Sequence, residues 1–178
     1  DVRRSIAFMD KYKSNHGLSP KVFQHSSVIL TCTDLSAKIT EIHFPSREIA
    51  LLGKLLGTAD LLGQMADRTY LEKLLFLFDE FRDGGVMGYK SELDLLRKTR
   101  DFYRMSRQRL AKDLAGVHEH MRSHFKLRWN LDRDLYMEAL ERHMSYLMYI
   151  LKNHEKDYRK YLRRGGLVAK LDKRQDKR

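Results

Sequence analysis

The sequence predicts an all-α fold, on three observations. Only two of its 178 residues are proline and ten are glycine, which is few for a loop-rich or all-β protein. Apolar residues recur at spacings of three and four along most of the chain, the rhythm of an amphipathic helix. No stretch of useful length alternates apolar and polar residues, as a half-buried strand would. With 42% apolar residues, the chain has enough hydrophobic side chains for the core of one domain.

Two short helices are expected near the N-terminal end. The first covers residues 3–15 and has Gly17 as its C-terminal cap. For the second, Ser19-Pro20 supplies an N-cap and a proline at the first helical position, and the apolar pattern runs to Leu30. The mixed, polar segment that follows predicts a loop up to Phe44.

A central helix is expected to begin at Pro45-Ser46. Its apolar rhythm is interrupted near Asp67–Thr69, which predicts a break or kink, and then continues to Phe81. Gly84-Gly85 follows directly and predicts the C-terminal end of this second part.

Two long antiparallel helices are expected in the C-terminal half. Ser91 followed by Asp94 resembles a capping box, and a charged amphipathic pattern continues from there to Val117. Asp132 lies where the pattern resumes and can cap a final helix, which Gly165-Gly166 ends.

A polar stripe crosses the apolar pattern of the central helix. Asp60, Gln64 and Asp67 are separated by four and three residues, so they share one face of a helix. A half-buried carboxylate is costly unless a positive charge pairs with it. The stripe therefore requires either a bound cation or an arginine or lysine from a neighbouring element. Gly57 and Gly63 keep this part of the helix narrow, which allows another helix or a ligand to approach closely.

Two segments resemble the HD-domain superfamily of metal-dependent phosphohydrolases. The run LLGTADLLGQ, residues 55–64, resembles the closing motif of that superfamily, an apolar helix that carries Ala-Asp-Leu. The upstream run SIAFMDKYKSNHGLSPKVFQHSSVILTCTDL looks like the helix, Gly-Leu-Ser turn and helix that precede this motif. The resemblance covers roughly residues 3–83 and implies an HD-type helical bundle.

This resemblance suggests three parts in the chain. Residues 1–85 would be the C-terminal part of an HD-like domain, residues 86–166 a long helical extension, and residues 167–178 a basic tail.

The resemblance also implies a function and a set of site residues. It implies a metal-dependent phosphohydrolase that acts on a nucleotide or another phosphoester and binds a divalent metal ion, with Asp60 as the last metal ligand. The residues expected to bind substrate or to orient the ligands are Gln64, Asp67 and Asp34, and the candidates for phosphate are Lys38, Arg47 and Arg68.

The remaining metal ligands of the superfamily, a His and an adjacent His-Asp pair, belong N-terminal to the matched part. The sequence contains no His-Asp dipeptide, so these ligands lie upstream of Asp1 or are absent. The alternative is a non-catalytic, all-helical module whose long helices bind a partner or form a homodimer. In that case the Asp60–Asp67 stripe forms structural ion pairs, and Asp34 is a turn residue.

Other residue patterns argue against further types of site. His120 and His124 could chelate a metal on one helix face, but Glu119 follows His118 and position 122 is Arg, so the zincin pattern fails. An exposed histidine-bearing face is expected instead. Cys32 is the single cysteine, which excludes an internal disulfide and fits a reducing cytoplasm.

The positive charge is concentrated at the C-terminal end. The net charge is +11, and the last twenty residues, from Arg159, hold 9 basic and 2 acidic side chains. Such a tail usually only solvates a chain end, and binding of a polyanion such as nucleic acid is the minority interpretation. No apolar run approaches the roughly twenty residues that span a bilayer, and no membrane association is expected.

Overall fold

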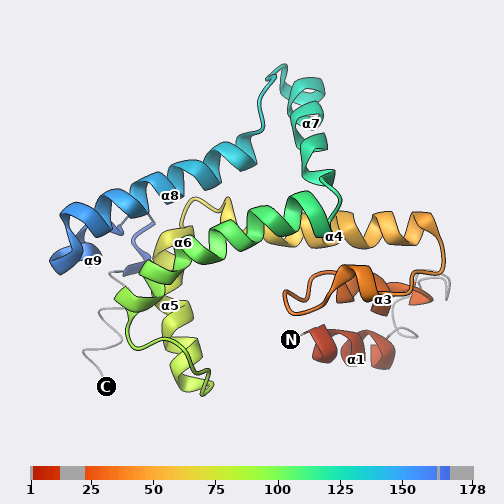
Figure 1. The fold of residues 1–178 in the computed structure, drawn as a ribbon, viewed down its shortest axis with the longest axis horizontal. Helices are drawn as coiled ribbons and strands as arrows, with labels where there is room; N and C mark the ends of the chain where they lie inside the picture. The colour runs from red at the N-terminus through yellow and green to blue at the C-terminus, as the bar shows by residue number, and fades with distance from the viewer. Residues whose placement is uncertain (1, 13–22, 164, 169–178) are drawn as a thin grey trace. The chain divides into compact units, whose positions relative to one another are not determined.

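The computed structural model describes residues 2–12, 23–163 and 165–168. Every regular element in these residues is helical and none is a strand, so the all-α prediction is confirmed (Figure 1). Within the same residues, no single helix is long and apolar enough to cross a membrane. One sharply bent pair of consecutive helices reaches the required length and composition together.

The chain forms two compact units, each built from two separate stretches. Unit 1 contains Asp1–Leu62 and Ser106–Asp132, and unit 2 contains Gly63–Met105 and Arg133–Arg178. The boundaries fall inside two long helices and at the start of the segment that leads to a third.

Unit 1 begins with helix α1 (Val2–Tyr12), which contacts α3 (Ser26–Thr31). The N-terminal helix therefore forms as predicted, although residues 13–22, which include the predicted caps, lie outside the described residues. A loop with one short 3-10 turn then leads to the central helix.

The central helix has the predicted start and break. Helix α4 (Arg47–Met65) follows Ser46, whose Oγ accepts a hydrogen bond from the Ile49 backbone N–H at 3.3 Å. Helix α5 (Tyr70–Asp83) follows after four residues and ends at Gly84.

Close packing of the chain after α3 against α4 depends on a small residue. A Cβ atom at Gly57 would lie 2.6 Å from the carbonyl oxygen of Cys32 and 3.1 Å from a Leu114 methyl group. The glycine thus lets the backbone at Cys32 lie directly on the helix, as its small size predicted.

A buried arginine holds the loop after α3 in place. Arg109 donates hydrogen bonds to the carbonyl oxygens of Asp34 at 2.7 Å, Ala37 at 3.1 Å and Cys32 at 3.3 Å. Backbone carbonyl oxygens, and not a carboxylate, accept the hydrogen bonds of this guanidinium group.

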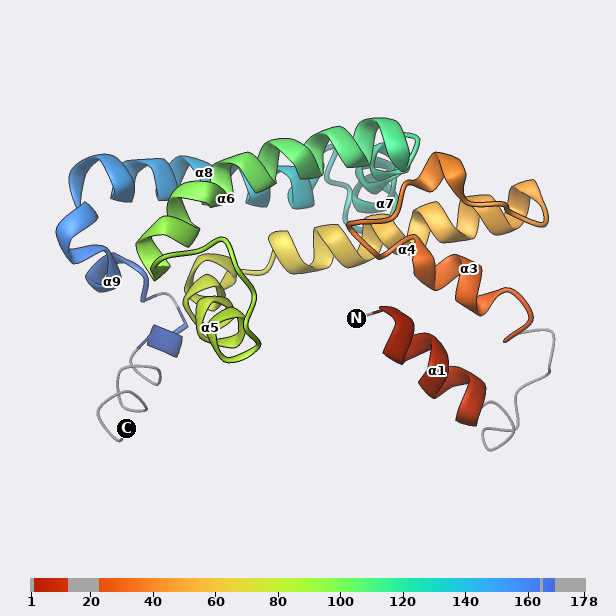
Figure 2. The ribbon, with the colours of Figure 1, turned by 60° about the horizontal axis from the view of Figure 1, so that its bottom comes forward.

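Unit 2 contains α5, most of α6 (Glu92–Gln108), α8 (Leu135–Asn153) and the short helix α9 (Tyr158–Tyr161). Helices α6 and α8 run in opposite directions in both views (Figure 2), as the two predicted long helices should. The core of this unit consists of fully or nearly fully buried aliphatic side chains, namely Leu71, Leu74, Leu75, Leu95, Leu96, Leu140, Leu147 and Ile150.

The first long helix is shorter than predicted. Helix α6 ends at Gln108, a π turn covers Arg109–Asp113, and the chain reverses at Ala115 and Gly116, both with positive φ. A separate helix, α7 (His120–Trp129), follows. The apolar spacing continues through this region because its leucines still face the core, so the pattern alone does not reveal the interruption.

The predicted limits of the last helix are also wrong. Asp134, not Asp132, caps α8: its carboxylate accepts hydrogen bonds from the backbone N–H groups of Tyr136 and Met137. Asp132 instead pairs with Arg122, at 2.9 Å. The helix ends at Asn153, well before the glycines at 165 and 166, because the chain turns there into α9.

Candidate functional site

The α4 face is the exposed stripe formed by Leu52, Leu56, Ala59 and Asp60. These residues follow one another at helical spacing, and all four are exposed. Leu52 is 50% and Leu56 is 37% exposed, and Leu51 beside them is 48% exposed. Asp60 is therefore an exposed residue at the end of a row of exposed leucines.

The described residues do not by themselves fit a divalent metal ion. In the parts of the chain that the structure describes, no three His, Cys, Asp or Glu side chains are grouped so that they could hold one. Asp60 offers one carboxylate, whereas a protein site for a transition metal uses three or four ligands.

Gln64 and Asp67 line a common groove at the start of α5. The groove has a volume of about 390 Å³, and its other walls include Lys73, Tyr70 and Leu77. The side chains combine an amide, an ion pair and apolar surface, as in many small-molecule sites.

The carboxylate of Asp67 makes its hydrogen bonds within and next to the turn between α4 and α5. It accepts hydrogen bonds at 2.7 Å from both the backbone N–H and the hydroxyl of Thr69, and it pairs with Lys73. Lys73 and these hydrogen bonds lower the pKa of Asp67 from 3.8 to about 2. The ionised form of this carboxylate is thus stabilised by its local partners.

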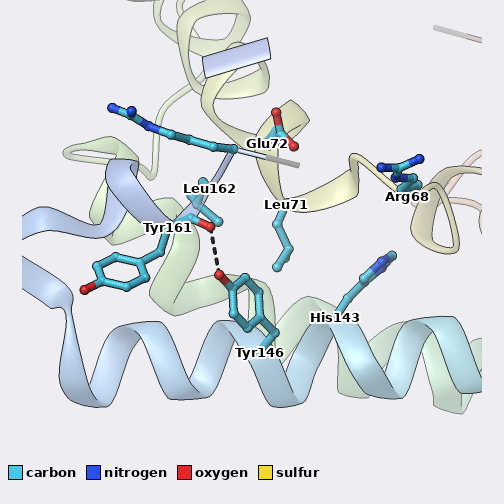
Figure 3. Close-up of a pocket in the computed structure, with 8 residues that line it drawn as sticks. Arg68, Leu71, Glu72, His143, Tyr146, Tyr161 and Leu162 are labelled. Atoms are coloured by element: carbon cyan, nitrogen blue, oxygen red, sulfur yellow. Dashed lines mark hydrogen bonds between the residues drawn. The ribbon is translucent and has the colours of Figure 1, made fainter. Parts of the chain in front are cut away.

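Arg68 lies beside this turn and lines a second, much smaller cavity (Figure 3). The cavity measures about 10 Å³, room for one water molecule at most. Its wall includes the buried His143, whose Nδ1 lies 3.0 Å from the carbonyl oxygen of Met65, and Tyr146, which donates a hydrogen bond to the Tyr161 carbonyl. This cavity is a packing feature of unit 2 and cannot hold a phosphate.

Asp34 and Lys38 each have a local partner in the loop after α3. Asp34 accepts hydrogen bonds from the backbone N–H of Ser36 at 2.8 Å and from its hydroxyl at 2.6 Å, which lower the pKa of the Asp34 carboxyl. Lys38 pairs with Glu41 at 2.9 Å, and both side chains are exposed. Asp34 thus forms the local turn that its position favours.

Arg47 lies at the other end of α4 from Asp60. Thirteen residues of helix separate them, about 20 Å at a rise of 1.5 Å per residue. One phosphate group cannot reach both, so a phosphate bound beside Asp60 needs a different cation.

The histidines of the HEHMRSH run are divided between two elements. His118 belongs to a 3-10 turn, whereas His120 and His124 are exposed on α7, in line with the expected histidine-bearing face. The ring of His124 lies edge-on to Trp129 at 5.3 Å.

Four buried charged or histidine side chains were not predicted from the sequence: Arg109, Glu72, Glu92 and His143. A signal exists for Arg109, because it continues the row of buried positions on its helix, Leu96, Thr99 and Ser106, at helical spacing. Glu72 and His143 also fall within apolar rows, but the sequence does not predict the backbone groups with which they form hydrogen bonds.

Comparison with known proteins links the chain to one family. Neither curated proteins nor solved structures give a match. The model of the Npun_R2479-like family matches residues 4–120, which is more than half of the chain and includes the whole α4 face. The chain belongs to the Npun_R2479-like family.

Proposed function

We propose that this chain supplies one carboxylate ligand, Asp60, to the divalent metal site of an HD-type phosphohydrolase. The observation that carries the proposal is the position of Asp60 on the exposed, leucine-rich α4 face. In the superfamily that residues 55–64 resemble, the remaining ligands are a His and an adjacent His-Asp pair N-terminal to the matched part.

The leucines and the carboxylate support the proposal together. Leu52 and Leu56 expose apolar surface whose burial is favourable by about 25 cal/mol per Å². An element that covers them also takes the neighbouring Asp60 out of water, and a buried carboxylate needs a positive partner. A metal ion held jointly with the covering element meets that need, as the resemblance of residues 55–64 to the HD closing motif implies.

The expected substrate is a nucleotide or another phosphoester, and the expected reaction is its hydrolysis. Gln64 is exposed and remains a candidate for binding this substrate, as the resemblance implies. Arg47 is about 20 Å along α4 from Asp60, so residues of the chain other than Arg47 must hold the phosphate.

Elemental analysis of the purified protein at its natural length tests the proposal. We expect a near-stoichiometric divalent metal in the wild type and its loss in Asp60→Asn. Asp101→Asn is the matched control, because Asp101 is an exposed helical aspartate that pairs with Arg104. A metal content that Asp60→Asn leaves unchanged, or no metal in the wild type, would overturn the proposal.

A non-catalytic interaction module is the second candidate, and the same α4 face favours it. A helical partner, or a second copy of the chain, could cover the leucines without any metal. This candidate predicts that Leu52→Glu abolishes an assembly seen by light scattering, while metal content stays at zero in every variant.

A further inference from the structure

The end of α7 presents a compact apolar tip to solvent. The α7 tip consists of Leu127, Trp129 and Leu131, which are 88%, 53% and 40% exposed. Leucines at such exposure are unusual on a folded surface when they cluster with an exposed tryptophan within five residues. The tip belongs entirely to unit 1.

The tip is held rigidly by the way α7 ends. Asn130 adopts the left-handed conformation, and its N–H donates to the Lys126 carbonyl at 2.9 Å. The bond from Asn130 to Lys126 is that of the αL C-cap motif, and the N–H of Leu131 donates in addition to the Phe125 carbonyl at 3.3 Å. Trp129 packs against the rings of Phe125 and His124, with ring centroids 5.6 and 5.3 Å away.

The flank of the tip is basic. Residues 120–131 include Arg122, Lys126 and Arg128 and no acidic residue. Asp132 pairs with Arg122 and lies 3.7 Å from Lys126. Arg128 has no ion pair in the part of the chain that the structure describes, and its guanidinium lies over the Trp129 ring at 5.3 Å. Positive charge therefore accompanies the apolar side chains up to the tip itself.

We propose that the α7 tip docks on an anionic membrane surface, with Leu127 and Trp129 in the interfacial region and the basic side chains on the lipid headgroups. Tryptophan prefers this interface, and basic residues are attracted to an anionic leaflet. The side chains of the tip are exposed. Three side chains are also far fewer than the 20 to 30 residues, about 800 Å², that each partner contributes to a stable protein interface. Nucleic acid is disfavoured because two of the three apolar side chains are leucines, which cannot stack on bases.

Tryptophan fluorescence tests the proposal directly, because Trp129 is the single tryptophan of the chain. We expect its emission to shift to shorter wavelength, with protection from iodide, when phosphatidylcholine vesicles containing phosphatidylserine are added. Vesicles of phosphatidylcholine alone should give a much smaller shift. High salt should weaken the binding, since it screens the basic flank.

Two variants and one control identify the surface that binds. Leu127→Glu should lower vesicle binding about tenfold or more, and Arg128→Gln by about fivefold. Met87→Glu introduces the same charge at a methionine that is 91% exposed elsewhere, and it should leave binding unchanged. Circular dichroism should show that all three variants remain helical.

Three outcomes would overturn the proposal. The first is no shift with phosphatidylserine vesicles, and the second is equal binding by Leu127→Glu and the wild type. The third is a Trp129 response to DNA, or to an acidic protein, that vesicles do not reproduce; it would assign the tip to that partner instead.

Discussion

The two units stabilise buried charges of opposite sign. Unit 1 buries a guanidinium group, Arg109, among the backbone carbonyls that follow α3. Unit 2 buries two carboxylates. Glu72 accepts hydrogen bonds from the backbone N–H groups of Gly165 and Leu167, and Glu92 accepts from Tyr158 and Arg159.

The difference follows from the backbone groups that each unit has to satisfy. The end of a helix leaves carbonyl oxygens without partners, so a cation fits there. The segment at Gly165–Leu167 docks through its backbone N–H groups and needs an acceptor, so the carboxylate of Glu72 fits there, whereas Glu92 pairs with the side chains of Tyr158 and Arg159. All three charged groups are buried within their own unit, whereas Asp60 is exposed on α4. The proposed role of Asp60 rests on its position on the exposed α4 face and on the resemblance of residues 55–64 to the HD closing motif.

Removing the buried cation should have the largest effect. Arg109→Leu leaves up to four carbonyl oxygens without their donor, and we expect unfolding in urea to become easier by about 3 kcal/mol. Arg109→Lys should fall between this variant and the wild type, because one ammonium group cannot reach all the carbonyls. A loss below 1 kcal/mol for Arg109→Leu would show that water replaces the guanidinium.

Neutralising a buried carboxylate of unit 2 should have a somewhat smaller effect. Glu92→Gln keeps the shape but leaves Arg159 without its charged partner, and we expect a loss of about 2 kcal/mol. Glu155→Gln is the control, because Glu155 and its partner Arg97 are 39% and 54% exposed and the pair should contribute less than about 1 kcal/mol. Equal losses in thermal unfolding would mean that the burial of Glu92 has no importance.

Alanine substitutions at two glycines of α4 should change stability in opposite directions, because only one of the glycines is in close contact with another segment. Gly57→Ala would place a methyl group 2.6 Å from the Cys32 carbonyl oxygen and should destabilise unit 1 by about 1–3 kcal/mol. Gly63→Ala meets no atom within 4 Å and should stabilise the protein by about 0.5–1 kcal/mol. Changes of the same sign in the two variants would contradict the close packing at Gly57.

The smallest effect concerns acid sensitivity at the turn between α4 and α5. Because the folded state lowers the pKa of Asp67 to about 2 from 3.8, Asp67 contributes stability above pH 3.8 that is lost as pH falls through about 2. Asp67→Asn should remove about 1 kcal/mol at neutral pH and flatten the acid limb of the stability curve. An unchanged acid limb would contradict the ion pair with Lys73.

The sequence predicts the helical fold because spacing and caps are local properties. The break between α4 and α5, the glycine end of α5 and the Ser46 cap are all encoded within a few residues. The end of α6 at Gln108 is not, because the leucines beyond it keep a helical spacing while the backbone changes direction at Ala115 and Gly116.

The site is less predictable than the fold. The spacing of Asp60, Gln64 and Asp67 predicted one common helix face, which is wrong for Asp67, because α4 ends at Met65 and Asp67 lies in the turn before α5. Partners of Arg109 lie more than seventy residues away in the chain, and only the three-dimensional structure brings them together.

Metal-dependent thermal unfolding of the natural-length protein is the most direct test of the claim that Asp60 serves function and not folding. A metal that binds only the folded state raises the unfolding temperature. We predict that wild type and Asp60→Asn unfold at the same temperature in chelator, and that added divalent metal stabilises only the wild type. A lower unfolding temperature of Asp60→Asn in chelator, or the same response of both proteins to metal, would contradict the claim.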